Sequence, residues 1–401
     1  GRVGGDGVMA KVRLGDIATV VTKGTTPTTM GFQFEDGGIN FVKIESISED
    51  GTFLKEKFSH ISDECNVQMR RSQLQENDIL FSIAGAIGRS AIVTKEILPA
   101  NTNQALAIIR VPKGKIDYNY LLYALSSSAI NQQATQHQQG VAQLNISLKN
   151  VSDFLLPIYT EAMQKQIVHN LKKIDKLISL RKQQLAKLDE LVKVRFVEMF
   201  GDLVVGDKIQ TGKKKIGEIA SVTKLAGFEF TKYIQYKEHG DIIMLRGLNC
   251  KQGKLILDDV KWIDRETSDL LPRSKLYYGD ILMTYAGTIG DVAMVDENDK
   301  YHLAPNVAKV SINNKKAYNP IFLMYLFLYS NDYIMRFASQ VAQASINMEK
   351  IRNFEYYFPD VTFQNQFAAF VECVGQQKQT VQQSLEKLEL MKKALMQEYF
   401  G

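Results

Sequence analysis

Residues 164–201 carry the feature that most constrains the fold, because their apolar residues recur at alternating steps of three and four. This spacing is typical of the seam of a coiled-coil helix. The stretch holds no Pro and no Gly before Gly201. Residues 364–401 repeat the pattern, and both stretches open Gln-x-Gln and close Phe-Gly. With basic residues filling the remaining steps, the expected helix-pairing residues are Ile167, Leu171, Ile174, Ile178, Leu185, Leu188, Val192 and Met199 in the first stretch, and Phe367, Val371, Val374, Val381, Leu385, Leu388, Leu395 and Tyr399 in the second.

The duplication extends through the chain, since the second half aligns with the first at an offset of 200 to 203 residues. Its clearest block pairs NDILFSIAGAIGRSAIV (77–93) with GDILMTYAGTIGDVAMV (279–295). Each block predicts two β-strands joined by a glycine turn. At 14–18 and 216–220 we expect a short strand or a turn. The pattern further predicts strands at 106–111 and 307–312 and helices at 118–125, 129–137, 320–329 and 332–339.

We therefore expect an α+β fold in which two mixed α/β domains are joined by two long helices, with an internal pseudo-twofold repeat. At roughly 1.5 Å per residue each helix is about 55 Å long, so it must pack along a partner, and the obvious partner is its own repeat. An antiparallel coiled coil would place the mixed domains at opposite ends. The expected segments are a leader or tag scar at 1–10, a first mixed domain at 11–159, a first helix at 160–201, a linker at 202–212, a second mixed domain at 213–360 and a second helix at 361–401.

Each expected seam contains two basic residues, Arg181 and Arg195 in the first helix and Lys378 and Lys392 in the second. Imperfect positions of this kind can fix the register of a helix pair. We expect these side chains to extend along the seam edge into solvent and not to form buried ion pairs.

Charge and cysteine content bound the class of protein. The net charge of +5, from 49 basic and 44 acidic residues, permits nucleic-acid binding without indicating it. The stretch from Lys165 to Lys187 contains seven basic residues and one acid, Asp175. This excess of positive charge favours either a solvated helix face or a surface for phosphate or an acidic partner. Three scattered cysteines encode no disulfide framework, and the chain starts without a signal-peptide pattern, so we expect a cytoplasmic location. No apolar run reaches the length of about 18 residues that spans a bilayer.

Sequence motifs for catalysis are missing. No P-loop occurs, and the five histidines form no spaced metal pair and no nucleophile–base set. The Gly-x-x-Gly turns at 85–88 and 287–290 lack the context of a phosphate-binding loop, so we interpret them as turn geometry. Asn319-Pro320-Ile321-Phe322 is faintly similar to the N-P-P-[FY] motif of amino-methyltransferases, but its repeat equivalent lacks it. We interpret Pro320 as the first residue of a helix, and we expect no cofactor and no metal on this chain.

The duplicated halves, the early Gly24-Thr25-Thr26-Pro27, the two AGxIG turns and the helix opening with Gln164 and Ile174-Asp175 resemble one family. The chain is similar, from Lys11 to Gly401, to the specificity (S) subunit of type I restriction-modification systems. The second half departs from the pattern, because no Gly-Thr-Thr-Pro follows Lys224 and Val374-Gly375 replaces Ile174-Asp175.

The resemblance implies a non-catalytic reader of double-stranded DNA, with each mixed domain a target-recognition domain for one half of a split, asymmetric sequence. It implies helices that hold these domains at a fixed spacing and dock two methyltransferase (modification) subunits, with restriction/translocase subunits joining for restriction. S-adenosylmethionine would bind the methyltransferase partner. The residues support one point independently of the resemblance: two different DNA-binding domains on a rigid helix pair require a bipartite site. At about 3.4 Å per base pair the half-site centres lie at most about 16 base pairs apart, and about 10 is expected if both domains meet one face of the duplex.

Base-reading residues should be polar or basic, lie on loops, and occur where the halves diverge. In the first half we expect DNA contacts from Lys23, Thr25, Thr26, Thr28, Lys43, Arg70, Arg71, Arg89, Gln104, Gln133, His137 and Gln139, the last three in a polar tract with Gln132, Gln136 and Gln138. In the second half the expected residues are Lys224, Lys232, Tyr233, Arg246, Asn249, Arg273, Lys275, Tyr285 and Gln340.

Two other functions remain open from the residues alone. One is a coiled-coil scaffold or adaptor that binds proteins at both ends. Such a function requires no particular motif, so this sequence permits it. An autonomous nuclease is a weaker alternative, because neither half shows a carboxylate cluster with a Lys at active-site spacing.

Overall fold

The computed structural model describes residues 8–136, 145–209, 211–339 and 344–401, and the chain divides into two compact units. Unit 1 combines Gly1–Lys182 with Gln383–Gly401, and unit 2 is Gln183–Gln382. Within the described residues no helix is both long enough and apolar enough to cross a membrane. The strand β1 begins at Val8, so residues 8–10, expected in the leader, belong to the first domain instead.

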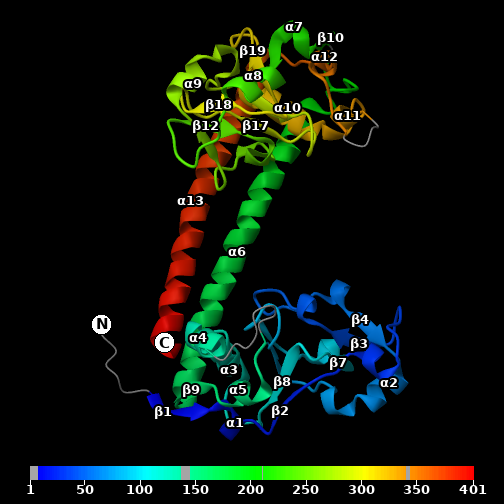
Figure 1. Ribbon diagram of the computed structural model, residues 1–401, viewed down its shortest axis with the longest axis vertical. Helices are drawn as coiled ribbons and strands as arrows, with labels where there is room; N and C mark the ends of the chain where they lie inside the picture. The colour runs from blue at the N-terminus through cyan, green and yellow to red at the C-terminus, as the bar shows by residue number, and fades with distance from the viewer. Residues whose placement is uncertain (1–7, 137–144, 210, 340–343) are drawn as a thin grey trace. The chain divides into compact units, whose positions relative to one another are not determined.

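Unit 1 contains two small sheets and a two-stranded ladder (Figure 1). The four-stranded antiparallel sheet has the order β2-β8-β5-β6, and the three-stranded sheet has the order β4-β3-β7, with β3 and β7 parallel. The strands β1 and β9 pair antiparallel, which brings the two ends of the domain together. The elements are β1 (Val8–Arg13), α1 (Leu14–Ile17), β2 (Val20–Lys23), η1 (Pro27–Met30), β3 (Ile39–Val42), η2 (Ile44–Ser46), η3 (Lys55–Lys57), β4 (Ser59–Ile61), α2 (Asp63–Gln68), η4 (Arg70–Ser72), β5 (Ile79–Ser82), β6 (Ser90–Ile92), η5 (Lys95–Ile97), β7 (Ala100–Thr102), β8 (Leu106–Arg110), α3 (Tyr118–Leu125), α4 (Ser128–Gln136), α5 (Leu148–Ser152), β9 (Leu155–Tyr159) and α6 (Glu161–Phe200).

The central strands of unit 1 are buried on both faces, which is why they read as continuous apolar runs. In β5, Ile79 and Phe81 join the core that α3 covers, while Leu80 joins a second core with Val42 of β3. Successive side chains of a strand point to opposite faces. One strand can therefore supply both cores, and the sheet lies between them.

Unit 2 repeats this order, with sheets β11-β19-β16-β17 and β15-β12-β18, a β10-β20 pair and an additional β13-β14 hairpin. The alternation recurs, since Ile281 and Met283 of β16 face one core and Leu282 faces another. The elements are β10 (Lys213–Lys215), α7 (Ile216–Ile219), β11 (Ala220–Lys224), α8 (Gly227–Tyr233), β12 (Ile242–Leu245), η6 (Gly247–Asn249), β13 (Cys250–Lys251), β14 (Lys254–Leu255), β15 (Lys261–Ile263), α9 (Arg265–Asp269), η7 (Pro272–Ser274), β16 (Ile281–Thr284), β17 (Val292–Met294), β18 (Tyr301–Leu303), β19 (Val307–Ile312), α10 (Pro320–Tyr329), α11 (Asn331–Met335), α12 (Met348–Arg352), β20 (Glu355–Tyr357) and α13 (Val361–Phe400).

Most local predictions agree with the structure, but the helix expected at 332–339 is the shorter α11 (Asn331–Met335). The AGxIG blocks form strand pairs around positive-φ glycines, such as Gly85 (φ 68°) and Gly287 (φ 82°), which confirms the turn interpretation. Pro320 is the first residue of α10, as predicted, and the structure adds that the Asn319 side chain caps that helix. The segments at 14–18 and 216–220 were expected as a strand or turn, but they form the short helices α1 and α7.

The helices α6 and α13 run antiparallel within each unit. In unit 1 the ion pairs are Asp175–Lys392 and Lys182–Glu389, so the residue number on α13 decreases as the residue number on α6 increases. In unit 2 the same sense follows from Asp189–Lys378 and the ring contact of Phe196 with Phe367 at 5.2 Å. The expected antiparallel coiled coil is thus confirmed in both units.

The expected helix-pairing residues lie along the inner faces of the two helices. The buried ones are Ile167, Leu171, Ile174, Leu188, Val192, Phe367, Val374, Val381 and Leu385. The half-buried ones are Ile178, Leu185, Met199, Val371, Leu388, Leu395 and Tyr399. Each seam also ends in a buried aromatic residue, Phe200 in unit 2 and Phe400 in unit 1, which packs into the mixed domain of its unit.

The seam lysines lie at the seam edge without forming buried ion pairs, as expected, but they also bridge the two helices. Both Lys378 and Lys392 form ion pairs with α6, to Asp189 and Asp175, although their side chains stay partly exposed. Arg195 pairs with Glu198 on its own helix, with its guanidinium carbon 5.9 Å from the ring centre of Phe370. Asp189 and Asp175 of α6 lie close enough to the two ammonium groups for ion pairs to form. The two lysines therefore form interhelical bridges at the seam edge.

The repeated Gln-x-Gln opening has a structural reason. The Gln164 side chain is buried, and it accepts from the Asp117 backbone N at 3.0 Å and donates to the Tyr159 carbonyl at 2.8 Å. In unit 2 Gln364 makes the same two bonds, to Asn319 N and Pro359 O. One amide side chain thereby locks the start of each long helix to the cap of α3 or α10.

Candidate nucleic-acid interface

Four strands of unit 1 end at one edge of the domain. Gly24, after β2, donates its backbone N–H to Asn103 O at 3.1 Å, and Ile83, after β5, donates to Ala105 O at 2.9 Å. The Thr102 hydroxyl at the end of β7 donates to Val42 O at the end of β3. We name the segments gathered here, residues 23–30, 43–46, 83–89 and 103–105, the loop edge of unit 1.

The loop edge presents several of the expected DNA-binding residues. Lys23 and Thr28 are exposed, and the Lys43 ammonium lies 4.2 Å from the ring centre of Phe34. The hydroxyl of Thr26 donates to the side-chain oxygen of Gln104 at 2.6 Å, and half-buried Thr25 lies beside this pair in sequence. The structure therefore brings residues from three separate loops together on one surface.

Gly24 is required for this convergence. A Cβ built on it would come within 1.6 Å of the Thr102 carbonyl oxygen, a distance that no side chain tolerates. Without a Cβ, the chain after β2 can lie directly against β7. The Gly-Thr-Thr-Pro pattern thus combines a close backbone contact with two hydroxyls at the loop edge.

Arg89 lies at the loop edge, but its guanidinium group is engaged. Its Nη1 donates to the carbonyls of Ile44 and Ile47, at 3.4 and 2.9 Å, and holds η2 against the AGxIG turn. A polar loop residue can satisfy backbone groups as well as a ligand, and the sequence does not distinguish the two uses. Arg89 thus positions Lys43, which precedes η2.

Arg70 and Arg71 lie elsewhere. Both are exposed on η4, beside the start of β5 and β7, since Gln73 O accepts from Arg110 and Leu74 N donates to Ala100 O. The loop edge lies where those strands end. The two arginines and the loop edge are therefore separated by the length of the strands.

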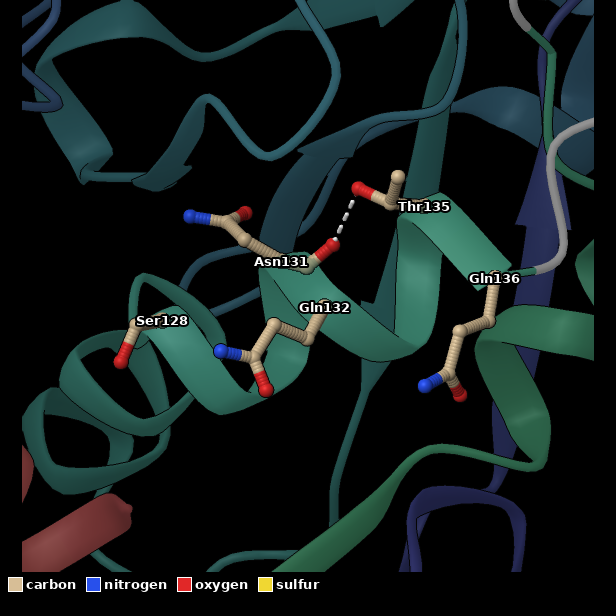
Figure 2. A pocket seen from close by; sticks show the side chains of 5 residues that line it. All are labelled: Ser128, Asn131, Gln132, Thr135 and Gln136. Atoms are coloured by element: carbon tan, nitrogen blue, oxygen red, sulfur yellow. Dashed lines mark hydrogen bonds between the residues drawn. The ribbon is translucent and has the colours of Figure 1, made fainter.

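The polar tract of α4 borders a shallow groove of about 530 Å³ (Figure 2). Its lining residues are Ser128, Asn131, Gln132, Thr135 and Gln136. The groove adjoins the loop edge, because a Cβ on Gly88 of the AGxIG turn would come within 2.4 Å of Asn131 Oδ1.

The side chain of Gln133 turns away from this groove and bonds both backbone groups of Leu155. It thereby pairs with β9, and the expected DNA contact is not supported by this geometry. His137, Gln138 and Gln139 lie outside the described residues, as does Gln340 of the second half.

Unit 2 builds the equivalent edge. Tyr285 N donates to Asn306 O at 3.0 Å and Ala304 N donates to Leu245 O at 3.2 Å, so β11, β12, β16 and β18 end together. We name residues 224–233, 246–249, 285–291 and 304–306 the loop edge of unit 2. Exposed Lys224 lies 5.3 Å from the Tyr285 ring centre, and Lys232 lies 5.0 Å from that of Tyr233.

Two expected residues of this edge serve the fold. Asn249 is fully buried, accepts from Arg246 N, and donates to the carbonyls of Ile256 and Asp259. Its side chain braces η6, so this geometry does not support the expected DNA contact. Arg246 forms an ion pair with Asp259 at 2.9 Å, which leaves its side chain half-buried at the edge.

Arg273 and Lys275 lie away from the unit 2 loop edge, around η7. Exposed Arg273 projects from that turn, while Lys275 pairs with Asp269 at 2.5 Å. The backbone carbonyls of both residues accept from the ammonium of Lys309, whose pKa is lowered by burial. Burial also lowers the pKa of His302, which bonds Leu271 O and Leu303 O. These buried groups stabilise the turn.

No group of three or more metal-ligating side chains lies together among the residues that the structure describes. The arrangement present is a pair of polar, partly basic edges, each built from loops that four strand ends hold in place. Such an edge can offer hydrogen-bond donors, acceptors and cations to an extended anionic surface.

Two repeated α+β domains, each with a loop edge and each joined to one of two paired long helices, define a duplicated recognition architecture. The chain belongs to the type I restriction modification DNA specificity domain family, whose model matches residues 7–190 and 210–390. It is accordingly a specificity subunit of the type I restriction-modification class.

Relatives with curated descriptions agree. The chain is 26% identical over 300 residues to the type I restriction enzyme EcoBI specificity subunit of Escherichia coli, covering 68% of this chain and 62% of that protein. It is 24% identical over 410 residues to the putative type I restriction enzyme MjaX specificity subunit of Methanocaldococcus jannaschii, covering 96% and 90%. A solved chain from work on complex assembly and conformational transition of the type I R-M system shares the fold, with a TM-score of 0.64, 15% identity and coverage of 98% and 97%.

Proposed function

We propose that this chain is the non-catalytic DNA reader of a type I restriction-modification complex, and that it recognises a bipartite, asymmetric target in double-stranded DNA. The observation that carries the proposal is the pair of loop edges, which share a scaffold and differ in the side chains they present. A split target with unlike halves needs this combination.

The shared part favours contacts that do not depend on base sequence. Lys23 and Lys224 end equivalent strands, opposite Ala107 and Ala308 in the two ladders. Lys43 and Arg246 likewise follow the equivalent strands β3 and β12. A cation kept at the same place in both domains suits the phosphate backbone, which is the same at every sequence.

The divergent part favours base reading. Between the first two strands of the sheets, unit 1 presents the threonine-rich turn η1, whereas unit 2 presents the helix α8. We infer that these segments distinguish the two half-sites, and we expect half-site centres about 10 base pairs apart.

We further propose that two methyltransferase subunits dock on the long helices. The seam is occupied by the helix pair, yet Leu191 and Val194 of α6 are 45% and 56% exposed in unit 2. In unit 1, Leu390 and Met391 of α13 are 67% and 54% exposed, and Met391 is the repeat equivalent of Leu191. Exposed apolar residues on a long helix in each unit, which also include Leu180 in unit 1 and Val197 in unit 2, suit two copies of one partner.

In this scheme the chemistry belongs to the partners. S-adenosylmethionine would bind the methyltransferase subunits, and restriction/translocase subunits would join the assembly for cleavage. This chain would contribute target choice and placement.

The proposal is tested by selection from a random pool of duplexes with this chain and its methyltransferase partner. The expected result is enrichment of a split motif with a fixed gap. The adaptor alternative predicts assembly with the partner but no enriched sequence, and that outcome would overturn the proposal. Metal-dependent cleavage by the purified chain would instead revive the nuclease alternative.

A further inference from the structure

The segment that replaces the threonine-rich turn in unit 2 carries a large apolar side chain in solvent. In α8, Leu225 just before the helix and Phe230, Tyr233 and Ile234 pack against Met244 and Ala304, which anchors the helix at the loop edge. The opposite face holds Phe228, Thr231 and Lys232, at spacings of three and four, and Phe228 is 71% exposed. A helix anchored this way holds its outward face in a fixed orientation.

Two basic residues flank Phe228 in the sequence, and the acid beside it, Glu229, accepts from the Ala226 backbone N–H at 3.0 Å. Lys232 lies one turn further along the same face, and Lys224 precedes the helix at the end of β11. An exposed phenylalanine between two cations suits a ligand that is anionic outside and apolar inside, a description that fits DNA. In unit 1 the equivalent segment exposes Thr28, Thr29 and Met30 instead.

We propose that Phe228 reads a thymine in the half-site of unit 2, an inference that rests on the proposed function. A phenyl ring has no hydrogen-bond donor or acceptor. The 5-methyl group of thymine is the apolar group that bases display in the major groove, and apolar side chains discriminate A·T pairs through it. Phe228 is thus a specificity residue, while Lys224 and Lys232 hold the flanking phosphates.

The test uses the full chain with its methyltransferase partner. Duplex selection is repeated with Phe228→Ala and, as a control, with Phe363→Ala, which removes another exposed phenylalanine of unit 2 from the first turn of α13. Phe228→Ala should relax one A·T position of one half-site by about fivefold or more and leave the other half-site unchanged. Phe363→Ala should leave the whole motif unchanged.

Replacing that thymine by deoxyuridine removes the methyl group alone. Wild-type affinity should then fall by the same factor as in Phe228→Ala, and the variant should bind both duplexes equally. An unchanged motif in Phe228→Ala overturns the inference. So does a result in which the substitution lowers affinity by the same factor for the thymine duplex and the uracil duplex. So does loss of partner binding by the variant, which would make α8 a protein-docking face. If the wild-type complex selects no motif at all, the proposed function fails first, and this result is distinguishable from the others.

Discussion

Lys392 of α13 donates to Asp175 of α6, with Nζ 2.6 Å from Oδ1, and this pair fastens the end of one long helix to the start of the other within unit 1. The second oxygen of Asp175 accepts from the Tyr123 hydroxyl at 2.6 Å, so α3 joins the same carboxylate. Burial, together with this bond to Asp175, raises the pKa of Tyr123 and keeps its hydroxyl a donor. One side chain therefore connects both helices with the mixed domain.

Asp175→Asn removes the charge that holds this junction together. Because the ion pair is about one-third exposed, we expect the loss to be about 1 kcal/mol. Hydrogen exchange of residues 385–400, followed by mass spectrometry, should accelerate by about fivefold, since local opening there becomes easier. Glu161→Gln, which breaks an exposed ion pair with Lys165, is the matched control. Equal exchange in the two variants would show that Asp175 does not secure the end of α13.

Acidification should destabilise unit 2 through His302. Its pKa in the folded chain is lowered from 6.5 by burial, so the unfolded chain takes up the proton first as the pH falls. The stability that neutral His302 contributes is complete above pH 6.5 and is lost as the pH falls from there toward the folded-state pKa. Urea unfolding can be followed by Trp262, the single tryptophan of the chain, on β15 of the same sheet. The midpoint should fall between pH 7 and pH 5 more in the wild type than in His302→Gln, and parallel curves would contradict the assignment.

The salt dependence of DNA binding should identify the phosphate contacts. Lys23→Ala with Lys43→Ala removes two cations from the unit 1 loop edge, and the slope of log K against log salt should fall by about 2. Arg70→Ala with Arg71→Ala is also expected to weaken binding and flatten the slope, because both side chains are exposed. Since they lie at the far ends of the strands, an unchanged slope for this pair would remove η4 from the interface. An unchanged slope for the lysine pair would contradict the assignment of the loop edge itself.

Partner stoichiometry should follow the two exposed apolar pairs. Leu191→Asp with Val194→Asp should reduce the bound methyltransferase subunits from two to one, and Leu390→Asp with Met391→Asp should do the same on the other unit. Native mass spectrometry of the assembled complex gives the count. Lys172→Glu with Lys173→Glu tests the basic flank of α6 instead. Retention of two partner subunits by both aspartate variants, with loss in the glutamate variant, would move the docking surface to that flank.

The sequence predicted those parts of the fold that depend on local periodicity and repetition. The bounds expected for α3 and α10, 118–125 and 320–329, agree with the structure, because each helix begins at a side-chain cap, Asp117 or Asn319, and consists largely of apolar residues. The pairing of β1 with β9 and the locking role of Gln164 depend on contacts between distant segments. Periodicity carries no information about such contacts.

The candidate site was less accessible to prediction. Arg89 and Asn249 have the side-chain chemistry of base readers, but they satisfy backbone groups within their own domains. The sequence did not identify Phe228, because an apolar residue two positions before Phe230 is typical of a buried helix face. Only the structure shows which of the two side chains points into solvent. Leu191 and Val194 did carry a signal, since their three-residue spacing lies outside the seam series.

The central claim is that each mixed domain reads one half of a split target independently. Exchange of residues 12–157 for those of a relative tests it most directly, and both junctions lie in the β1-β9 ladder, where Lys11 pairs with Pro157 and Val12 with Leu156. The hybrid chain, assembled with the methyltransferase partner, is given a random duplex pool and the retained DNA is sequenced. We predict that one half of the recognised motif changes while the other half and the gap stay the same. A motif that changes in both halves, with the long helices untouched, would contradict the account.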